Sequence, residues 1–153
     1  SCVFNMPNGI VEFKDIYNKD PFVAPANLVG SEPATAANYG AFFTAKFPCE
    51  VMEFSAVWET ASTFGNVQLE RIQGTTAVGS GDLILSTAVD TWKTANTTNY
   101  GALVVGTVRI LDRGDRLALR DAGTLTSAAG LQTETLIKPL GKGHYAAHGS
   151  AIL

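Results

Sequence analysis

The chain has 153 residues, of which 46% are hydrophobic and only 16% charged, and its formal net charge is −3 at pH 7. A chain of this length buries a core as one domain, and its acidic balance argues against a nucleic-acid binder, which shows a basic face. No apolar run approaches the roughly 18 residues of a membrane-spanning helix, so we expect no membrane contact either.

Residues 1–38 hold four of the six prolines and no clear strand alternation, yet apolar side chains are spread through them. Such a long lead is unusual inside a compact domain. We therefore predict an extended N-terminal arm over residues 1–38 that docks on the outside of a sandwich, its own or a neighbour's. The alternative is an ordinary N-terminal strand with loops. No signal peptide is evident, and we expect synthesis and assembly in the cytoplasm.

From about residue 39 to residue 140, short apolar and β-branched runs recur between clusters of Gly, Thr, Ser and Asn. Seven or eight short strands at this spacing predict an all-β domain over 39–140, an antiparallel β-sandwich or a barrel. The runs are YGAFFTAKF (39–47), EVMEFSAVWE (50–59), GNVQLERIQG (65–74), DLILSTAV (82–89), YGALVVGTVRIL (100–111), DRLALRD (115–121) and LQTETLIKPL (131–140).

Alternation within these runs predicts which side chains face the core. Every second residue from Met52 to Trp58 is apolar or small, whereas Glu53 and Ser55 lie between them. One face inward and one face solvated is the antiparallel pattern. After the last run, residues 141–153 are Gly-rich and end on three apolar residues, so we predict a short C-terminal tail that docks.

Residues 113–115 spell Arg-Gly-Asp, the tripeptide that integrins recognise when a loop tip displays it. Here it lies directly between two apolar runs. Gly and Asp adopt turn dihedrals at low cost, so we interpret it as a tight turn between two antiparallel strands. We expect the charges that follow, Arg116, Arg120 and Asp121, on the solvent face of the next strand.

Other candidates for chemistry lack the partners that they need. His144 and His148 have the i, i+4 spacing of zinc ligands, but no Glu follows His144 and no third ligand is evident. Cys2 and Cys49 are too few for a metal or disulfide framework. We expect surface histidines, free thiols, and a small apolar role for Cys49 at a strand start.

The Gly-rich segment 74–82 lacks the lysine and the following helix of a phosphate-binding loop. Glu53 and Glu59, near Glu50, fall on a predicted solvent face, whereas general acid–base chemistry needs a desolvated acid. Trp58 completes an inward row and is expected in the core. We therefore expect no enzyme, no cofactor and no metal site.

Two stretches, VWETASTFGNVQLERIQGTTAVGSGDLIL (57–85) and GDRLALRDAGTLTSAAGLQTETLIKPL (114–140), resemble the decoration, or cement, proteins of tailed-bacteriophage heads. The likeness lies in a Thr-, Gly- and Ala-rich style rather than in a fixed motif. It implies a jelly-roll-like sandwich that forms homotrimers on the outer surface of the capsid. It also implies binding across the junctions between copies of the major capsid protein, which resists the pressure of packaged DNA.

On this hypothesis the apolar side chains of the arm bind the capsid or sister subunits. A carbohydrate-binding β-sandwich remains an alternative, with Trp92, Tyr100 or Tyr145 as the stacking aromatic residue. A component of a tail or head fibre is a further alternative. The predicted partner-binding residues of the arm are Phe4, Ile10, Phe13, Ile16, Tyr17 and Phe22.

Overall fold

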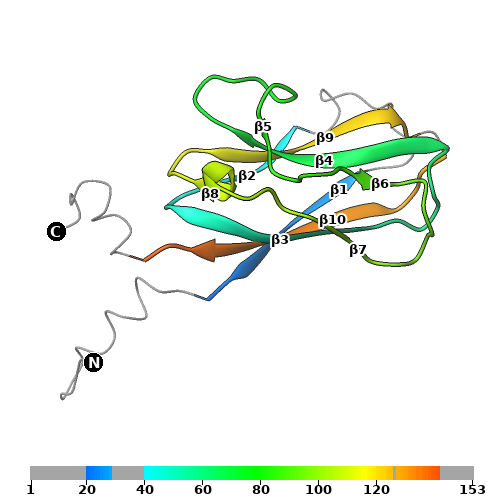
Figure 1. The fold of residues 1–153 in the computed structure, drawn as a ribbon, viewed down its shortest axis with the longest axis horizontal. Helices are drawn as coiled ribbons and strands as arrows, with labels where there is room; N and C mark the ends of the chain where they lie inside the picture. Colours follow the sequence, from blue (N-terminus) through cyan, green and yellow to red (C-terminus); the bar gives the residue numbers. More distant parts are fainter. Residues whose placement is uncertain (1–19, 29–39, 126, 142–153) are drawn as a thin grey trace, which may run out of the picture.

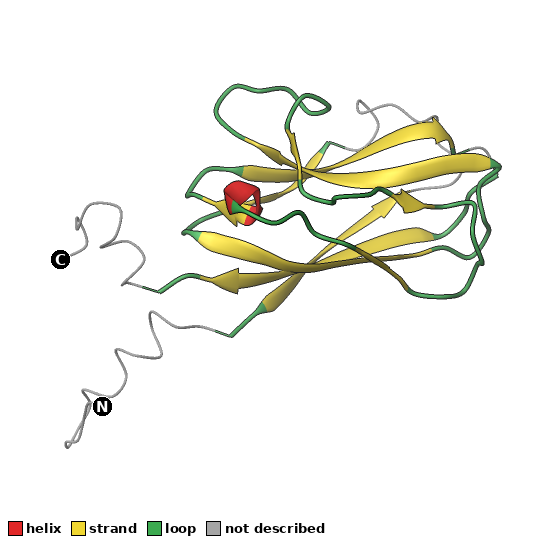
Figure 2. Ribbon diagram, viewed as in Figure 1, coloured by secondary structure: helices red, strands yellow, loops and turns green. Residues whose placement is uncertain are grey.

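The computed structural model describes residues 20–28, 40–125 and 127–141, which form two antiparallel sheets packed face to face (Figure 1). Strands dominate the described residues, which hold a single short 3-10 helix (Figure 2). The elements are β1 (Phe22–Leu28), β2 (Ala41–Thr44), β3 (Cys49–Val57), β4 (Phe64–Ile72), β5 (Asp82–Leu83), β6 (Val89–Asp90), β7 (Asn99–Gly101), η2 (Thr107–Arg109), β8 (Ile110–Leu111), β9 (Arg116–Thr124) and β10 (Leu131–Pro139).

Strands from the first half of the chain pair with strands from the second half, as if the whole chain formed one long hairpin that folds over on itself. β1 pairs with β10, β2 with β9, β3 with β7 and β8, and β4 with β5 and β6. Rolling brings β10 against β3 and β9 against β4, which gives the sheet orders β1-β10-β3-β7 and β2-β9-β4-β5. This is the topology of a jelly roll. The predicted all-β antiparallel sandwich is confirmed, together with the jelly-roll character that the resemblance implied.

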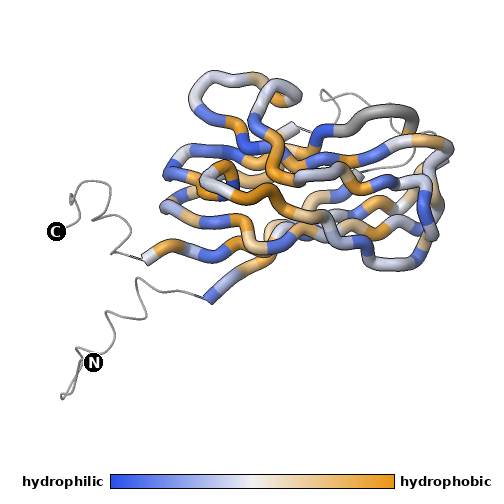
Figure 3. The backbone as a smooth tube through the Cα atoms, in the orientation of Figure 1, coloured by the Kyte–Doolittle hydropathy of each residue, from blue (hydrophilic) through white to orange (hydrophobic). Residues whose placement is uncertain are grey.

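The core fills the space between the two sheets. Hydrophobic residues recur along the strands between hydrophilic ones (Figure 3), and the inward members of each strand are buried. On β3 and just after it, Phe54, Ala56 and Trp58 are at most 1% exposed, as their alternation predicted. The indole Nε1 of Trp58 donates a hydrogen bond to the Lys93 carbonyl at 3.0 Å, so its one polar atom is satisfied inside the core.

The predicted inward position of Met52 is wrong, because β3 carries a bulge there. Leu136 pairs with Glu53 and Ile137 pairs with Val51, so Met52 is an extra residue without a partner on β10. A bulge shifts the alternation of a strand by one position. Val51 is therefore buried, and Met52 is 41% exposed beside an exposed Glu53.

The predicted continuous strand over residues 100–111 is also interrupted. The chain leaves the sheet after β7. Gly106 has a φ of 122°, a backbone conformation that residues other than glycine rarely adopt. The helix η2 and the two-residue strand β8 follow, and Val105 at the turn is 99% exposed. An apolar run that alternates well can thus contain a break, since one glycine suffices to redirect the backbone.

The run predicted over residues 82–89 divides into β5 and β6, and a side chain closes the gap between them. Gln68 on β4 donates from Nε2 to the Leu85 carbonyl at 3.0 Å and accepts from the Leu85 amide at 2.8 Å. The side-chain amide replaces a rung of the backbone ladder. Leu85 also forms a bridge to Leu103, which joins the two sheets along this edge.

β1 lies inside the range that the sequence analysis assigned to an arm. It pairs with β10 from Phe22 opposite Ile137 to Leu28 opposite Leu131, so the sandwich begins at Phe22 rather than at residue 39. Its alternation is short and interrupted by Pro25, a residue that strands tolerate mainly at the edge of a sheet. The rest of the predicted arm, 1–19 and 29–38, lies outside the described residues, as does the tail from residue 142.

Replacing Gln68 by Ala is expected to lower the free energy of unfolding by about 2–4 kcal/mol, because the buried Leu85 amide and carbonyl both lose their partner. Urea denaturation measures the change. Gln132→Ala is the matched control, since Gln132 is exposed on β10 and its removal should cost under about 0.5 kcal/mol. Equal losses in the two variants would show that the Gln68 rung does not stabilise the fold.

Candidate functional site

β1 begins and β10 ends at the same end of the sandwich, since Phe22 pairs with Ile137 (Figure 1). The loops 45–48 and 73–81 and the turn 112–115 join strands at this end too. We call it the terminal end. The segments that precede β1 and follow β10, both predicted to dock on partners, therefore join the sandwich side by side.

An aromatic cluster lies beside this junction. The Phe22 ring on β1 lies 5.9 Å from the Phe43 ring on β2 and 6.4 Å from the Phe47 ring, measured between centroids. Phe22 and Phe43 are half-buried, and Phe47 is 38% exposed. The cluster joins the two sheets where β1 meets β2. Of its three rings, Phe47 is the one exposed at the terminal end.

Phe22 is the only predicted partner-binding residue that the structure describes. It packs on rings of its own chain, and its role in partner binding stays a prediction. The other predicted partner-binding residues lie outside the described residues, namely Phe4, Ile10, Phe13, Ile16 and Tyr17.

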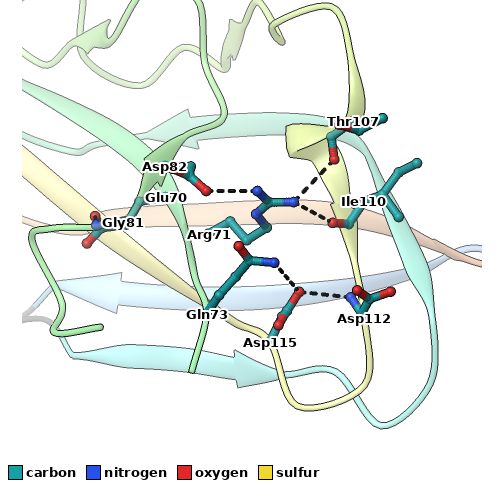
Figure 4. A network of polar contacts seen from close by, with 9 residues as sticks. All are labelled: Glu70, Arg71, Gln73, Gly81, Asp82, Thr107, Ile110, Asp112 and Asp115. Carbon is teal, nitrogen blue, oxygen red and sulfur yellow. Dashed lines mark hydrogen bonds and ion pairs between the residues drawn. The ribbon is translucent and has the colours of Figure 1, made fainter. Parts of the chain in front are cut away.

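The Arg-Gly-Asp tripeptide is a tight turn, as predicted, but it joins β8 of one sheet to β9 of the other. The Asp115 carboxylate is buried and accepts hydrogen bonds from the Asp112 amide at 2.9 Å and from Gln73 Nε2 at 3.2 Å (Figure 4). The Gly114 amide donates to the Ala45 carbonyl at 2.8 Å. Only the arginine and the glycine of the tripeptide are exposed, so its carboxylate stabilises the turn itself.

Arg71 on β4 ties the two sheets together at the terminal end (Figure 4). Its Nη1 donates to the carbonyls of Thr107 at 3.3 Å and Ile110 at 3.1 Å, which belong to η2 and β8. Its Nη2 forms an ion pair with Asp82 at 2.8 Å. A planar guanidinium suits this task, because its donors point in several fixed directions at once.

The Gly-rich segment 74–82 binds a carboxylate of its own chain. The Gly79 and Gly81 amides donate to the two carboxylate oxygens of Glu70, at 2.6 and 2.9 Å. Arg120 Nη1 lies 4.0 Å from Glu70 Oε1. Glu70 is fully buried, and a Cβ at Gly81 would collide with the Arg71 carbonyl. Paired backbone amides form an anion-binding concavity. Here an internal anion occupies it.

Sequence reasoning missed the roles of Gln68, Glu70 and Arg71. A signal was present, since QLERI holds three polar residues among apolar ones, directly before a Gly-rich segment. Polarity alone places such residues on a solvent face. The segments that cover them come from elsewhere in the chain, and sequence patterns do not show that cover.

Cys49 is fully buried at the start of β3, the position that its apolar interpretation predicted. Burial raises the pKa of its thiol to about 12, and the nearby Asp115 carboxylate adds to the shift. The thiol is therefore protonated and unreactive at neutral pH.

Glu53 and Glu59 are exposed, as predicted, and Glu50 forms an ion pair with Arg109 at 3.1 Å. Within the described ranges, no three His, Cys, Asp or Glu side chains are grouped so as to bind a metal ion. His144 and His148 fall outside those ranges. None of the segments that the structure describes forms a helix with the length and hydropathy that crossing a membrane requires.

No protein-family profile and no curated protein matches the chain. Among solved structures, it is similar to structures of infectious bursal disease virus, from the Gt strain (14% identity, TM-score 0.34) and the Gx strain (16% identity, TM-score 0.33). These matches cover 84% and 82% of this chain, but only 35% and 38% of the viral chains. At these TM-scores they do not establish a common fold, and the likeness to phage decoration proteins stays a prediction.

Replacing Glu70 by Gln is expected to lower the free energy of unfolding by about 2–3 kcal/mol, because the amide can accept from only one of the two glycine amides. Glu134→Gln, on the exposed side of β10, serves as the control and should change stability by under about 0.5 kcal/mol. If the two variants denature at the same urea concentration, the Glu70 contacts contribute no net stability.

The buried thiol of Cys49 is expected to lower the free energy of unfolding at alkaline pH. Its pKa rises from an ordinary value of 9.0 to about 12 on folding, so the protonated thiol favours the folded state below pH 9 and this advantage is lost as the pH rises toward 12. Between pH 9 and 11, the wild-type free energy of unfolding should fall faster than that of Cys49→Ala, by about 1.4 kcal/mol per pH unit. Parallel curves for the two proteins would contradict the shift.

Proposed function

We propose that this chain is a non-enzymatic structural protein of a virion, which decorates and stabilises a capsid. The observation that carries the proposal is the terminal end. The first and last strands of the jelly roll, β1 and β10, are neighbours, and the end where β1 begins and β10 ends carries an aromatic cluster with a partly exposed ring. A block with two neighbouring extensions is suited to binding several surrounding subunits at once.

The buried reactive groups support a structural role. The Glu70 carboxylate is held by two backbone amides, the Asp115 carboxylate closes a turn, and the Cys49 thiol stays protonated. Each of these groups stabilises or fills the fold, and none is presented to a substrate. Viral capsid domains and lectins both use jelly rolls, so the fold is compatible with the proposal but does not decide it.

In this proposal the extensions supply the contacts with the shell. Phe4, Ile10, Phe13, Ile16 and Tyr17 precede β1, and their burial against the major capsid protein or sister subunits would supply the binding energy. The chain would act as a homotrimer on the outer surface of the capsid, over the junctions between major capsid proteins, after assembly in the host cytoplasm. Three extensions per trimer give avidity even where each contact is weak.

The variant Phe13→Ala/Tyr17→Ala tests the extensions. Particles of the virus that encodes the chain, prepared without it by deleting its gene, are mixed with purified protein and sedimented. We expect the double variant to bind at least about tenfold more weakly than wild type, since it removes two aromatic side chains from the interface. Phe64→Ala, which removes a 64% exposed ring from the start of β4, should bind like wild type.

Thermal unfolding and light scattering complete this test. The double variant should keep the wild-type melting temperature and the trimeric mass, because both side chains precede the sandwich. A variant that unfolds would show that these side chains belong to the core. A folded variant that binds particles like wild type would show that the extension does not carry attachment, and either result overturns the proposal.

A further inference from the structure

A cleft of about 210 Å³ opens between β6 and β7, which belong to different sheets. Residues 87–90 line one side, residues 99–102 line the other, and Lys93 completes the lining. We propose that this cleft binds a single neutral sugar ring, such as the terminal residue of a glycan. The proposal goes beyond capsid decoration and shares no residue with the terminal end.

The charges in the cleft favour a neutral ligand. Lys93 Nζ lies 3.7 Å from Asp90 Oδ2, so the two charges in the lining offset each other. Both side chains remain partly exposed, 55% for Lys93 and 34% for Asp90, and can bond to a ligand as well. A carboxylate accepts and an ammonium donates, which suits neighbouring sugar hydroxyls because each hydroxyl can do both.

Tyr100 provides the aromatic surface that a sugar ring needs. Tyr100 is one of the residues that line the cleft; it is 66% exposed and lies on β7, which pairs with β3. A tyrosine offers a flat apolar face with a polar tip, so the C–H face of a sugar can pack on the ring while its hydroxyls meet Asp90 and Lys93. A few polar groups around an apolar surface are typical of small-ligand sites.

The cleft is preformed, because the loop that carries Lys93 is braced on the core. Trp58 donates to the Lys93 carbonyl at 3.0 Å, and the Asn96 amide donates to the Trp58 carbonyl at 2.8 Å. Ser62 and Thr91 hydroxyls form a further hydrogen bond at 2.8 Å. Little ordering is then needed on binding, which favours affinity in a small site.

Of the aromatic residues that the sequence suggested for stacking, the structure places Tyr100 in the cleft. Trp92 is 45% exposed and adjoins Lys93, whose Nζ lies 5.7 Å from the indole centroid. Trp92 therefore offers a second aromatic surface for a longer glycan that extends beyond the first ring. Tyr145 lies outside the described residues.

The test combines a glycan array with saturation-transfer NMR on the full chain, using methyl glycosides of glucose, galactose, mannose and N-acetylglucosamine. At least one neutral glycoside should give a saturable signal. Tyr100→Ala and Asp90→Asn should each weaken binding at least tenfold. Phe64→Ala is the matched control, because Phe64 is 64% exposed but lies outside the cleft, and it should bind like wild type.

Three results with the neutral glycosides would overturn the proposal. These are the absence of binding to every neutral glycoside and array glycan, undiminished binding by Tyr100→Ala, and an equal loss in Phe64→Ala. Preference for inorganic phosphate or for acidic sugars would also contradict it, since the argument rests on offset charges. Phe13→Ala/Tyr17→Ala should keep full sugar binding, so failure of the capsid proposal and failure of this one are distinguishable.

Discussion

A rolled hairpin leaves backbone groups unpaired wherever a strand breaks or a loop crosses a sheet, and unpaired buried groups are costly. In this jelly roll, three side chains of β4 meet that constraint. Gln68 supplies a missing rung at Leu85, Glu70 binds the amides of Gly79 and Gly81, and Arg71 caps carbonyls of the opposite sheet. The segment around Leu85, the loop 73–81 and the contact between the two sheets at the terminal end all depend on this one strand. Gln68 and Glu70 are therefore buried, although such residues usually lie on a surface.

The sequence predicted the four longest strands of the two sheets, β3, β4, β9 and β10, because each overlaps a run of apolar and β-branched residues. Prediction failed where one residue altered the backbone path. Pro25 obscured β1, the bulge at Met52 reversed the inward face, and Gly106 interrupted a run of apolar residues. It also failed where a polar residue binds a distant segment, because the hydrogen-bond partners of Glu70 and Arg71 are between 9 and 39 positions away. Periodicity is a local property, and these contacts are not local.

Motifs were informative only once their surroundings were known. The Arg-Gly-Asp carboxylate is buried in its own turn, and the Gly-rich segment binds an internal carboxylate in place of a phosphate. By contrast, the cleft at Tyr100 has no sequence motif and forms where two sheets meet. The described residues thus hold an aromatic cluster where β1 begins and β10 ends, and a separate cleft between β6 and β7.

β1 and β2 each form one outer edge of their sheet, and such strands can recruit a strand from another molecule. The proline in the middle of β1 has no hydrogen to donate, and β2 spans only four residues. Both edges are poor templates for continuing a sheet. Association of two copies by edge-to-edge pairing is therefore disfavoured at both of these strands.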